Sequence, residues 1–232
     1  NRKDFVDNIK KTLLYSKVNK AIAEKYIIEK DEITTVYFIV DGRPYLASVA
    51  DRIVKTFDKR VIPLPVGYIW PSKYLTLYEK SLDEKMKAAI QEMGLQNGMI
   101  FIQSIVKDDN IYPYDIGFRL SGTQEHIILE EICGYNPLKL LVDYAVEGEF
   151  KNKNELIKKI NPYFNEYACN ITFLAAPSKI KKYVGLEKIM DIKGVIRYVK
   201  NKLEEEIIPD SALGTLNQVV LRVFAKAKTF DE

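Results

Sequence analysis

The sequence predicts an α+β fold in which helices flank an antiparallel sheet. Two stretches carry this prediction, because in each of them apolar and β-branched residues lie on both sides of a short turn. Residues 34–53 turn at Asp41-Gly42, a pair that favours the type I′ turn of a β-hairpin. Residues 97–120 turn at residues 108–110 and resume extended character afterwards. Two hairpins with helices around them make an antiparallel sheet the expected centre of the fold.

Helical spacing of apolar residues and the signals that cap or stop a helix predict the helices. They are expected at residues 5–14, 83–93, 125–133, 137–146 and 151–160. Apolar runs predict further short strands at residues 168–175, 179–184, 195–201 and 219–227. Prolines predict loops at residues 63–65 and 70–72, whereas residues 21–35 are expected to form a strand, an acidic turn and the start of another strand.

A change of composition after residue 150 and the Asn161-Pro162 pair predict a domain boundary. Residues 1–160 are expected to form the larger unit, and residues 161–232 a smaller β-rich one. The chain begins almost directly in a helix and ends on a helix-start signature. Both ends are therefore expected to be cut from a longer protein.

Composition bounds the function classes. The chain has 232 residues, of which 47% are hydrophobic and 29% charged, as in ordinary globular domains. Its net charge of +3 is spread along the sequence, so neither nucleic acid nor a membrane is an expected partner. No apolar run reaches the roughly 18 residues of a membrane span, and no signal peptide is evident. Cys133 and Cys169 lack metal-site spacing and predict free thiols in a reducing cytoplasm.

The second hairpin places polar side chains on one ridge. If its turn centres on Asp109, Gln103 and Asp115 are direct cross-strand neighbours, with side chains roughly 5 Å apart. Two oxygen-bearing side chains at that separation can share Mg²⁺, which prefers oxygen ligands. Arg119 lies on the same face because strand side chains alternate with period two. A solvated sheet face is the alternative for such a pattern.

A small-residue loop, residues 120–123, follows this hairpin and opens directly into a helix. Free backbone N–H groups at such a position suit an anion. The chain has neither a G-x-x-x-x-G-K-[S/T] loop nor a G-x-G-x-x-G motif, so a P-loop or Rossmann nucleotide site has no support.

The pattern N-G-x-x-x-x-Q, a turn, and then acid-x-x-x-R-x-x-G resembles the nucleotide and metal hairpin of the ATP-grasp ligases, in particular the carbamoyl-phosphate synthetase large subunit. The resemblance implies that Gln103 is a metal ligand and that Asp115 stands where the family has a metal-binding Glu. It implies that Arg119 contacts phosphate or the acyl group. Gly117 departs from the pattern, because the family usually has Asn there.

A second stretch, A-I-A-E-K-Y-I-I-E-K-D-E, resembles the ATP-grasp hinge. The resemblance implies that Glu24, Tyr26 and Ile27 hold the adenine and that Glu32 holds the ribose hydroxyls. Solubilising edge charges are the alternative for these acids. Basic side chains in the next region reach the nucleotide phosphates in the family, which makes Arg52 a candidate. A basic solvated loop, continuing through Lys55, Lys59 and Arg60, is its alternative.

The run that contains Pro177-Ser178-Lys179-Ile180 resembles the small C-terminal β-subdomain of carboxylating ATP-grasp enzymes, whose usual motif is Pro-Gly-x-Ile. The resemblance therefore implies an ATP-grasp fold with a nucleotide-binding region over residues 1–160 and that subdomain over 161–232. ATP and Mg²⁺ are the implied cofactors. A nucleotide, a small carboxylate and a second copy of the chain in a homodimer are the implied partners.

The implied activity is that of a cytoplasmic, ADP-forming ligase, which phosphorylates a carboxylate and lets an amine, ammonia or thiol attack the acyl-phosphate. Arg119 is the expected catalytic residue. His126, the only histidine, is expected to be structural or to line a pocket, since this chemistry requires no histidine base. In the family the glycine-rich phosphate loop precedes the hinge, so residues 1–232 alone are expected to be a poor enzyme. Two alternatives stay open: a nucleotide-binding regulatory module that has lost catalysis, and a structural or assembly domain.

Overall fold

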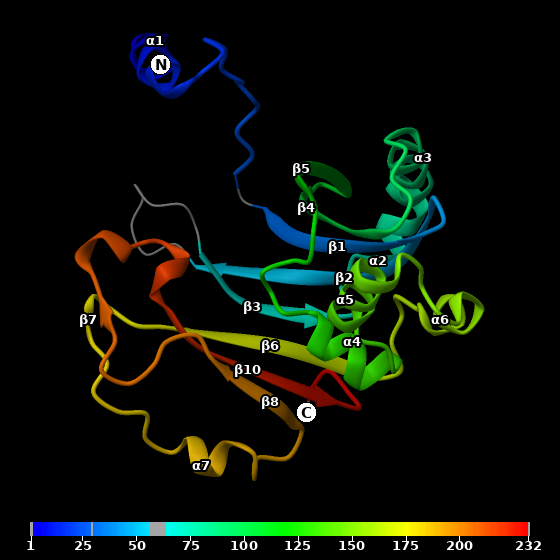
Figure 1. Cartoon of the computed structure of the whole chain (residues 1–232). Helices are drawn as coiled ribbons and strands as arrows, with labels where there is room; N and C mark the ends of the chain where they lie inside the picture. The colour runs from blue at the N-terminus through cyan, green and yellow to red at the C-terminus, as the bar shows by residue number, and fades with distance from the viewer. Residues whose placement is uncertain (1, 29, 56–63, 232) are drawn as a thin grey trace.

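An eight-stranded antiparallel sheet forms the centre of the computed structural model (Figure 1). The strand order is β5-β4-β1-β2-β3-β6-β10-β8, and a two-stranded sheet, β7-β9, lies beside it. The structure describes residues 2–28, 30–55 and 64–231. Within these residues, no helix is long and apolar enough to cross a membrane.

The strands have the following bounds: β1 (Asp31–Val40), β2 (Arg43–Lys55), β3 (Leu64–Trp70), β4 (Gly98–Lys107), β5 (Asn110–Phe118), β6 (Tyr167–Leu174), β7 (Ser178–Lys179), β8 (Val195–Lys200), β9 (Ile207–Ile208) and β10 (Val219–Ala227). The helices are α1 (Arg2–Tyr15), α2 (Leu75–Tyr78), α3 (Glu84–Glu92), α4 (His126–Cys133), α5 (Pro137–Glu147), α6 (Lys153–Lys159) and α7 (Leu186–Ile189). A π-helical turn, Glu79–Asp83, joins α2 to α3, and 3₁₀ turns lie at Asp210–Ala212 and Leu216–Gln218.

Both predicted hairpins are confirmed. Asp41 and Gly42 join β1 to β2 with positive φ angles of 49° and 77°. Asp108 and Asp109 join β4 to β5 with φ angles of 51° and 55°. These left-handed conformations match the twist of a hairpin, and Asp tolerates them better than most residues. The pairing of β1 with β4 then sets the two hairpins side by side.

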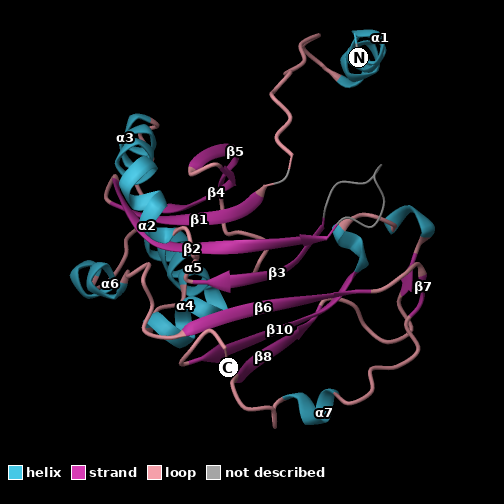
Figure 2. Cartoon of the chain, turned by 180° about the vertical axis from the view of Figure 1, so that it is seen from behind, coloured by secondary structure: helices cyan, strands magenta, loops and turns pink. Residues whose placement is uncertain are grey.

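Helices cover both faces of the sheet (Figure 2). On one face, Phe38, Trp70 and Phe224 pack with apolar residues of α4 and α5. On the other face, Tyr37 and its neighbours pack with residues of α2 and α3. Adjacent residues of β1 serve opposite cores because strand side chains alternate. The α+β prediction of an antiparallel sheet flanked by helices is confirmed.

Strand β3 corrects the loop predicted at residues 63–65. Leu64 and Pro65 belong to this strand, whereas Pro63 lies outside the described residues. The proline is tolerated because it pairs only with Val54 of β2, while the bonds to β6 begin at Gly67. Through the β3–β6 pair, strands from both sides of the boundary predicted after residue 160 hydrogen-bond in one sheet.

Two further strand predictions are wrong. Residues 21–28 have no regular secondary structure, and of residues 179–184 only Lys179 lies in a strand, β7. The five predicted helices are confirmed within a few residues at each end. Helix α1 has no buried residue, and an extended segment connects it to the sheet (Figure 1).

Candidate functional site

The β4–β5 hairpin has the predicted register. Gln103 pairs with Asp115 and Phe101 with Gly117, so the expected cross-strand neighbours do face each other. The register then shifts between Gln103 and Ser104, which pairs with Pro113. Tyr114 is therefore the extra residue of a β-bulge, and a bulge turns one more side chain toward the face that Gln103 occupies.

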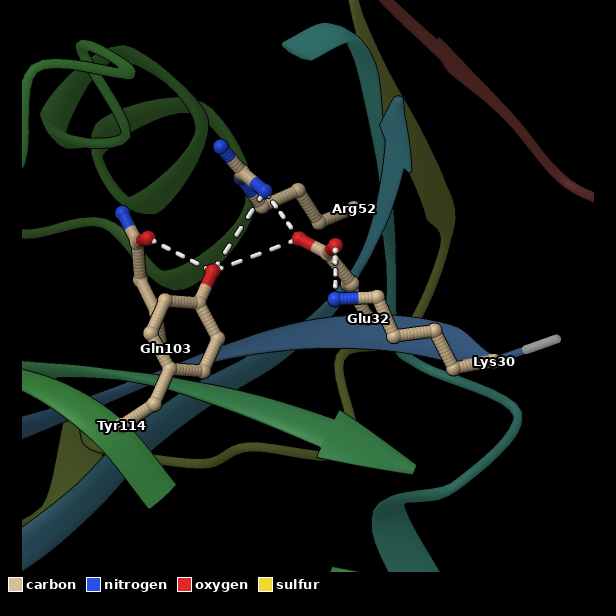
Figure 3. Close-up of polar contacts among 5 residues, drawn as sticks. All are labelled: Lys30, Glu32, Arg52, Gln103 and Tyr114. Atoms are coloured by element: carbon tan, nitrogen blue, oxygen red, sulfur yellow. Dashed lines mark hydrogen bonds and ion pairs between the residues drawn. The ribbon is translucent and has the colours of Figure 1, made fainter. Parts of the chain in front are cut away.

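Tyr114 connects the predicted metal ligand to the predicted ribose ligand (Figure 3). Its hydroxyl lies 2.9 Å from Gln103 Oε1 and 3.3 Å from Glu32 Oε2, and it can donate to one of them at a time. Burial raises the pKa of this phenol. Sequence reasoning missed Tyr114, although Pro113 offered a signal, because proline inside a strand marks an edge or a bulge.

Glu32 lies at the centre of a charged cluster. It is 6% exposed, and its carboxylate accepts a hydrogen bond from Arg52 Nη1 and lies 3.1 Å from Lys30 Nζ. The pairing of Ile33 with Asp51 makes Glu32 and Arg52 neighbours on one face. The Arg52 side chain is 11% exposed, so this ion pair is largely desolvated.

Two cavities lie at this cluster, and the larger of the two has a volume of about 530 Å³. Six of the predicted site residues line it, as do several aromatic and aliphatic side chains. The lining comprises Glu24, Lys25, Tyr26, Ile27, Lys30, Glu32, Arg52, Gln103, Ile105, Tyr112, Pro113 and Tyr114. The hinge residues contribute one wall as extended chain, with Tyr26 84% exposed. Of the predicted basic loop, Lys59 and Arg60 lie outside the described residues.

Arg52 and Gln103 also line a smaller cavity of about 130 Å³. Its walls come from five strands and from the loop before α4. The lining comprises Thr34, Arg52, Pro65, Tyr68, Phe101, Gln103, Arg119, Ser121, Gly122, Thr123, Leu216 and Arg222. The structure thus brings Gln103 and Arg119 together, as the period-two argument predicts.

The guanidinium group of Arg119 stacks on the aromatic ring of Phe101. Its guanidinium carbon lies 4.5 Å from the centre of the Phe101 ring, and its Nη1 donates to the Leu120 carbonyl at 2.9 Å. The same ring explains Gly117. A Cβ at position 117 would lie 2.2 Å from a Phe101 ring carbon, so the ring occupies the space that a side chain at 117 needs.

Asp115 is exposed and lines neither cavity, although it faces Gln103. In the described part of the chain, no group of three or more His, Cys, Asp or Glu residues could hold a metal. Any metal bound by the predicted pair would have two protein side chains as ligands, one amide and one carboxylate.

Glu125 is a buried carboxyl that sequence reasoning did not single out. It accepts hydrogen bonds from Ser48 Oγ and, at 3.2 Å, from Trp70 Nε1. Burial raises its pKa to about 7. His126 next to it is half-buried, which lowers its pKa, and it lines neither cavity.

No protein-family model and no curated protein matches the chain. Several solved structures are similar to the chain. L-amino acid ligase from Bacillus licheniformis has a TM-score of 0.69 at 18% identity, over 88% of this chain and 50% of that one. Phosphoribosylglycinamide synthetase from Anaerococcus prevotii has a TM-score of 0.73 at 17% identity, over 100% of this chain and 56% of that one.

Biotin carboxylase from Campylobacter jejuni has a TM-score of 0.68 at 15% identity, over 98% of this chain and 49% of that one. These proteins are ATP-grasp ligases, so the ATP-grasp fold that the resemblance implied is confirmed. The chain spans about half the length of these structures.

Proposed function

We propose that this chain carries one wall of the active site of an ATP-dependent, ADP-forming ligase of the carbamoyl-phosphate synthetase kind. That ligase activates a carboxylate as an acyl-phosphate and joins it to an amine, ammonia or a thiol. One observation carries the proposal: Glu32, Arg52, Tyr114 and Gln103 form a continuous polar network between a large and a small cavity. A similar fold, a biotin carboxylase domain from Hydrogenobacter thermophilus, is described in complex with MgADP and bicarbonate.

The larger cavity suits a nucleoside. Its volume falls within the roughly 300–1,000 Å³ range of small-molecule sites, and it joins aromatic and aliphatic walls to charged and amide side chains. Extended backbone at Tyr26 and Ile27, next to Glu24, supplies the donor and acceptor that adenine needs. The Glu32 carboxylate has about four acceptor positions, so it can take a ribose hydroxyl beside its present partners.

Gln103 and Asp115, on the two strands of the β4–β5 hairpin, are suitable ligands for Mg²⁺. Gln103 Oε1 and the Asp115 carboxylate are hard oxygens on paired positions, and Mg²⁺ usually takes one or two such ligands plus phosphate and water. The ion would supply neutralisation of the triphosphate charge. Gln103 would have to share its oxygen with the Tyr114 hydroxyl or lose that hydrogen bond.

Arg119 is the residue we assign to the transferred group. The guanidinium stays charged and offers donors in a planar fork that suits phosphate and carboxylate oxygens. Stacking on Phe101 orients it at the wall of the smaller cavity. There it would stabilise negative charge that develops as the phosphoryl group moves to the carboxylate oxygen.

Calorimetric titration of residues 1–232 with ADP, with and without Mg²⁺, tests the proposal. Saturable binding that strengthens with Mg²⁺ is expected, and Gln103→Ala and Asp115→Ala should each remove most of the Mg²⁺ contribution. Gln96→Ala, on the loop before β4 and lining neither cavity, is the matched control. Absence of MgADP binding by a folded chain would refute the nucleotide site.

A second candidate is a nucleotide-binding module without catalysis. The Phe101 ring over Gly117 favours it, because it excludes a side-chain ligand at the position where the resemblance expects Asn. The exposure of Asp115 points the same way. Metal-dependent phosphoryl transfer by the whole protein, abolished by Asp115→Ala, would exclude this candidate. Cytoplasmic location and homodimer formation stay predictions for that whole protein.

A further inference from the structure

The smaller cavity collects three guanidinium groups from distant parts of the chain. Arg52 comes from β2, Arg119 from the segment after β5 and Arg222 from β10. Glu32 pairs with Arg52, but it lines only the larger cavity. Among the described residues, neither Arg119 nor Arg222 forms an ion pair with a carboxylate. The cavity therefore has an excess of positive charge.

Arg222 has donors that no described residue pairs with. Its Nη1 donates to the Gly122 carbonyl, which satisfies one of its five donors. Its Nε is buried and has no hydrogen-bond partner among the described residues, and the same holds for Arg52 Nε and Thr34 Oγ1. All three residues line this cavity. Burial also lowers the pKa of Arg222, so the site disfavours its charge until an anion arrives.

Size restricts the anion. The cavity of about 130 Å³ is well below the roughly 300–1,000 Å³ of sites for drug-sized ligands. It therefore suits a carboxylate with a short substituent better than a nucleoside. The Tyr68 hydroxyl lies beside Arg52 and Arg222, whose charges counter the rise that burial causes in its pKa. It adds a neutral hydrogen-bonding group to a cationic lining.

We propose that Arg222 binds the carboxylate group of the substrate to be phosphorylated in this smaller cavity, which Arg119 also lines. The inference rests on the proposed function and deepens it: the substrate is a small carboxylate, and β10 completes its site. Arg52 and Gln103, which line both cavities, mark the border across which the carboxylate meets the nucleotide. Residues 161–232 thus contribute a substrate contact as well as strands to the sheet.

Acetate and inorganic phosphate are the probes, titrated separately into residues 1–232 at constant ionic strength and followed by calorimetry. Acetate is expected to bind saturably, and Arg222→Gln should weaken it at least tenfold. Arg222→Lys, which keeps a charge but not the fork, should fall between the two. Arg197→Gln, an exposed arginine of the adjacent strand β8, is the matched control and should not change acetate binding.

MgADP affinity distinguishes this inference from the proposed function. It should change less than twofold in Arg222→Gln, which also shows that the variant is folded. Acetate binding without MgADP binding would sink the proposed function and leave an anion site. Equal acetate affinity in wild type and Arg222→Gln would overturn the inference. So would a site that takes phosphate and not acetate, since it would then belong to the nucleotide, and so would the absence of binding for both probes.

Discussion

The two cavities are built in different ways, although they share Arg52 and Gln103. Strands and a short loop line the smaller one, so hydrogen-bonded register determines where Gln103 and Arg222 lie, and the Phe101 ring orients Arg119 just beyond the end of β5. The larger one has a wall of extended chain, Glu24 to Ile27, with no strand partner and an exposed Tyr26. We infer that the smaller cavity is preorganised, whereas the larger one would gain order on binding the proposed nucleotide.

Removal of Arg52 should affect both cavities and have the largest effect. Arg52→Ala leaves the buried Glu32 carboxylate with only Lys30 and Tyr114, and breaking a buried pair costs about 3–5 kcal/mol. We expect a loss of that size in the free energy of unfolding, measured with urea, together with loss of MgADP binding. Arg43→Ala, at the exposed first residue of β2, should stay within about 0.5 kcal/mol of wild type.

The pH dependence of stability tests the burial of Glu125, in the loop next to the smaller cavity. Its folded pKa, about 7, lies above the ordinary glutamate pKa of 4.5, so its contribution to stability is fully present below pH 4.5 and is lost as pH rises through 7. The difference corresponds to about 3 kcal/mol. Urea unfolding at pH 5 and pH 7.5 should show a fall in stability that Glu125→Gln reduces. An identical pH dependence in the variant would contradict the burial argument.

Gly117→Asn probes the packing that orients Arg119. The new side chain collides with the Phe101 ring, and overpacking of this kind costs about 1–3 kcal/mol. A lower melting temperature is expected, and Phe101→Leu in the same chain should recover part of the loss. If Gly117→Asn melts like the wild type, Phe101 can leave the position and an Asn ligand could be accommodated there.

Tyr114→Phe should have the smallest effect and act on the larger cavity. The variant loses a hydroxyl hydrogen bond, worth about 0.5–1.5 kcal/mol, and frees Gln103 Oε1. Mg²⁺ should then strengthen ADP binding more than it does in the wild type, by a few-fold in calorimetry. Tyr112→Phe, in the same cavity wall, is the matched control. A weaker Mg²⁺ effect in Tyr114→Phe would show that the phenol supports the metal ligand.

Local patterns in the sequence determined the two hairpins, the helices and the pairing of Gln103 with Asp115. These features depend on turn residues and on period-two or helical spacing within a few tens of residues. The same reasoning placed Arg119 on the face of Gln103, and the cavity that both residues line agrees with it.

The tertiary structure alone decided the rest. A bulge turned Tyr114 into the network, the β3–β6 pair joined the two halves of the chain, and β10 brought Arg222 to Arg119. Glu125 became a buried acid only because Ser48 and Trp70 from other strands surround it. Contacts between residues far apart in sequence depend on the order and packing of the strands. The spacing of residues within one stretch of chain does not determine that order or packing.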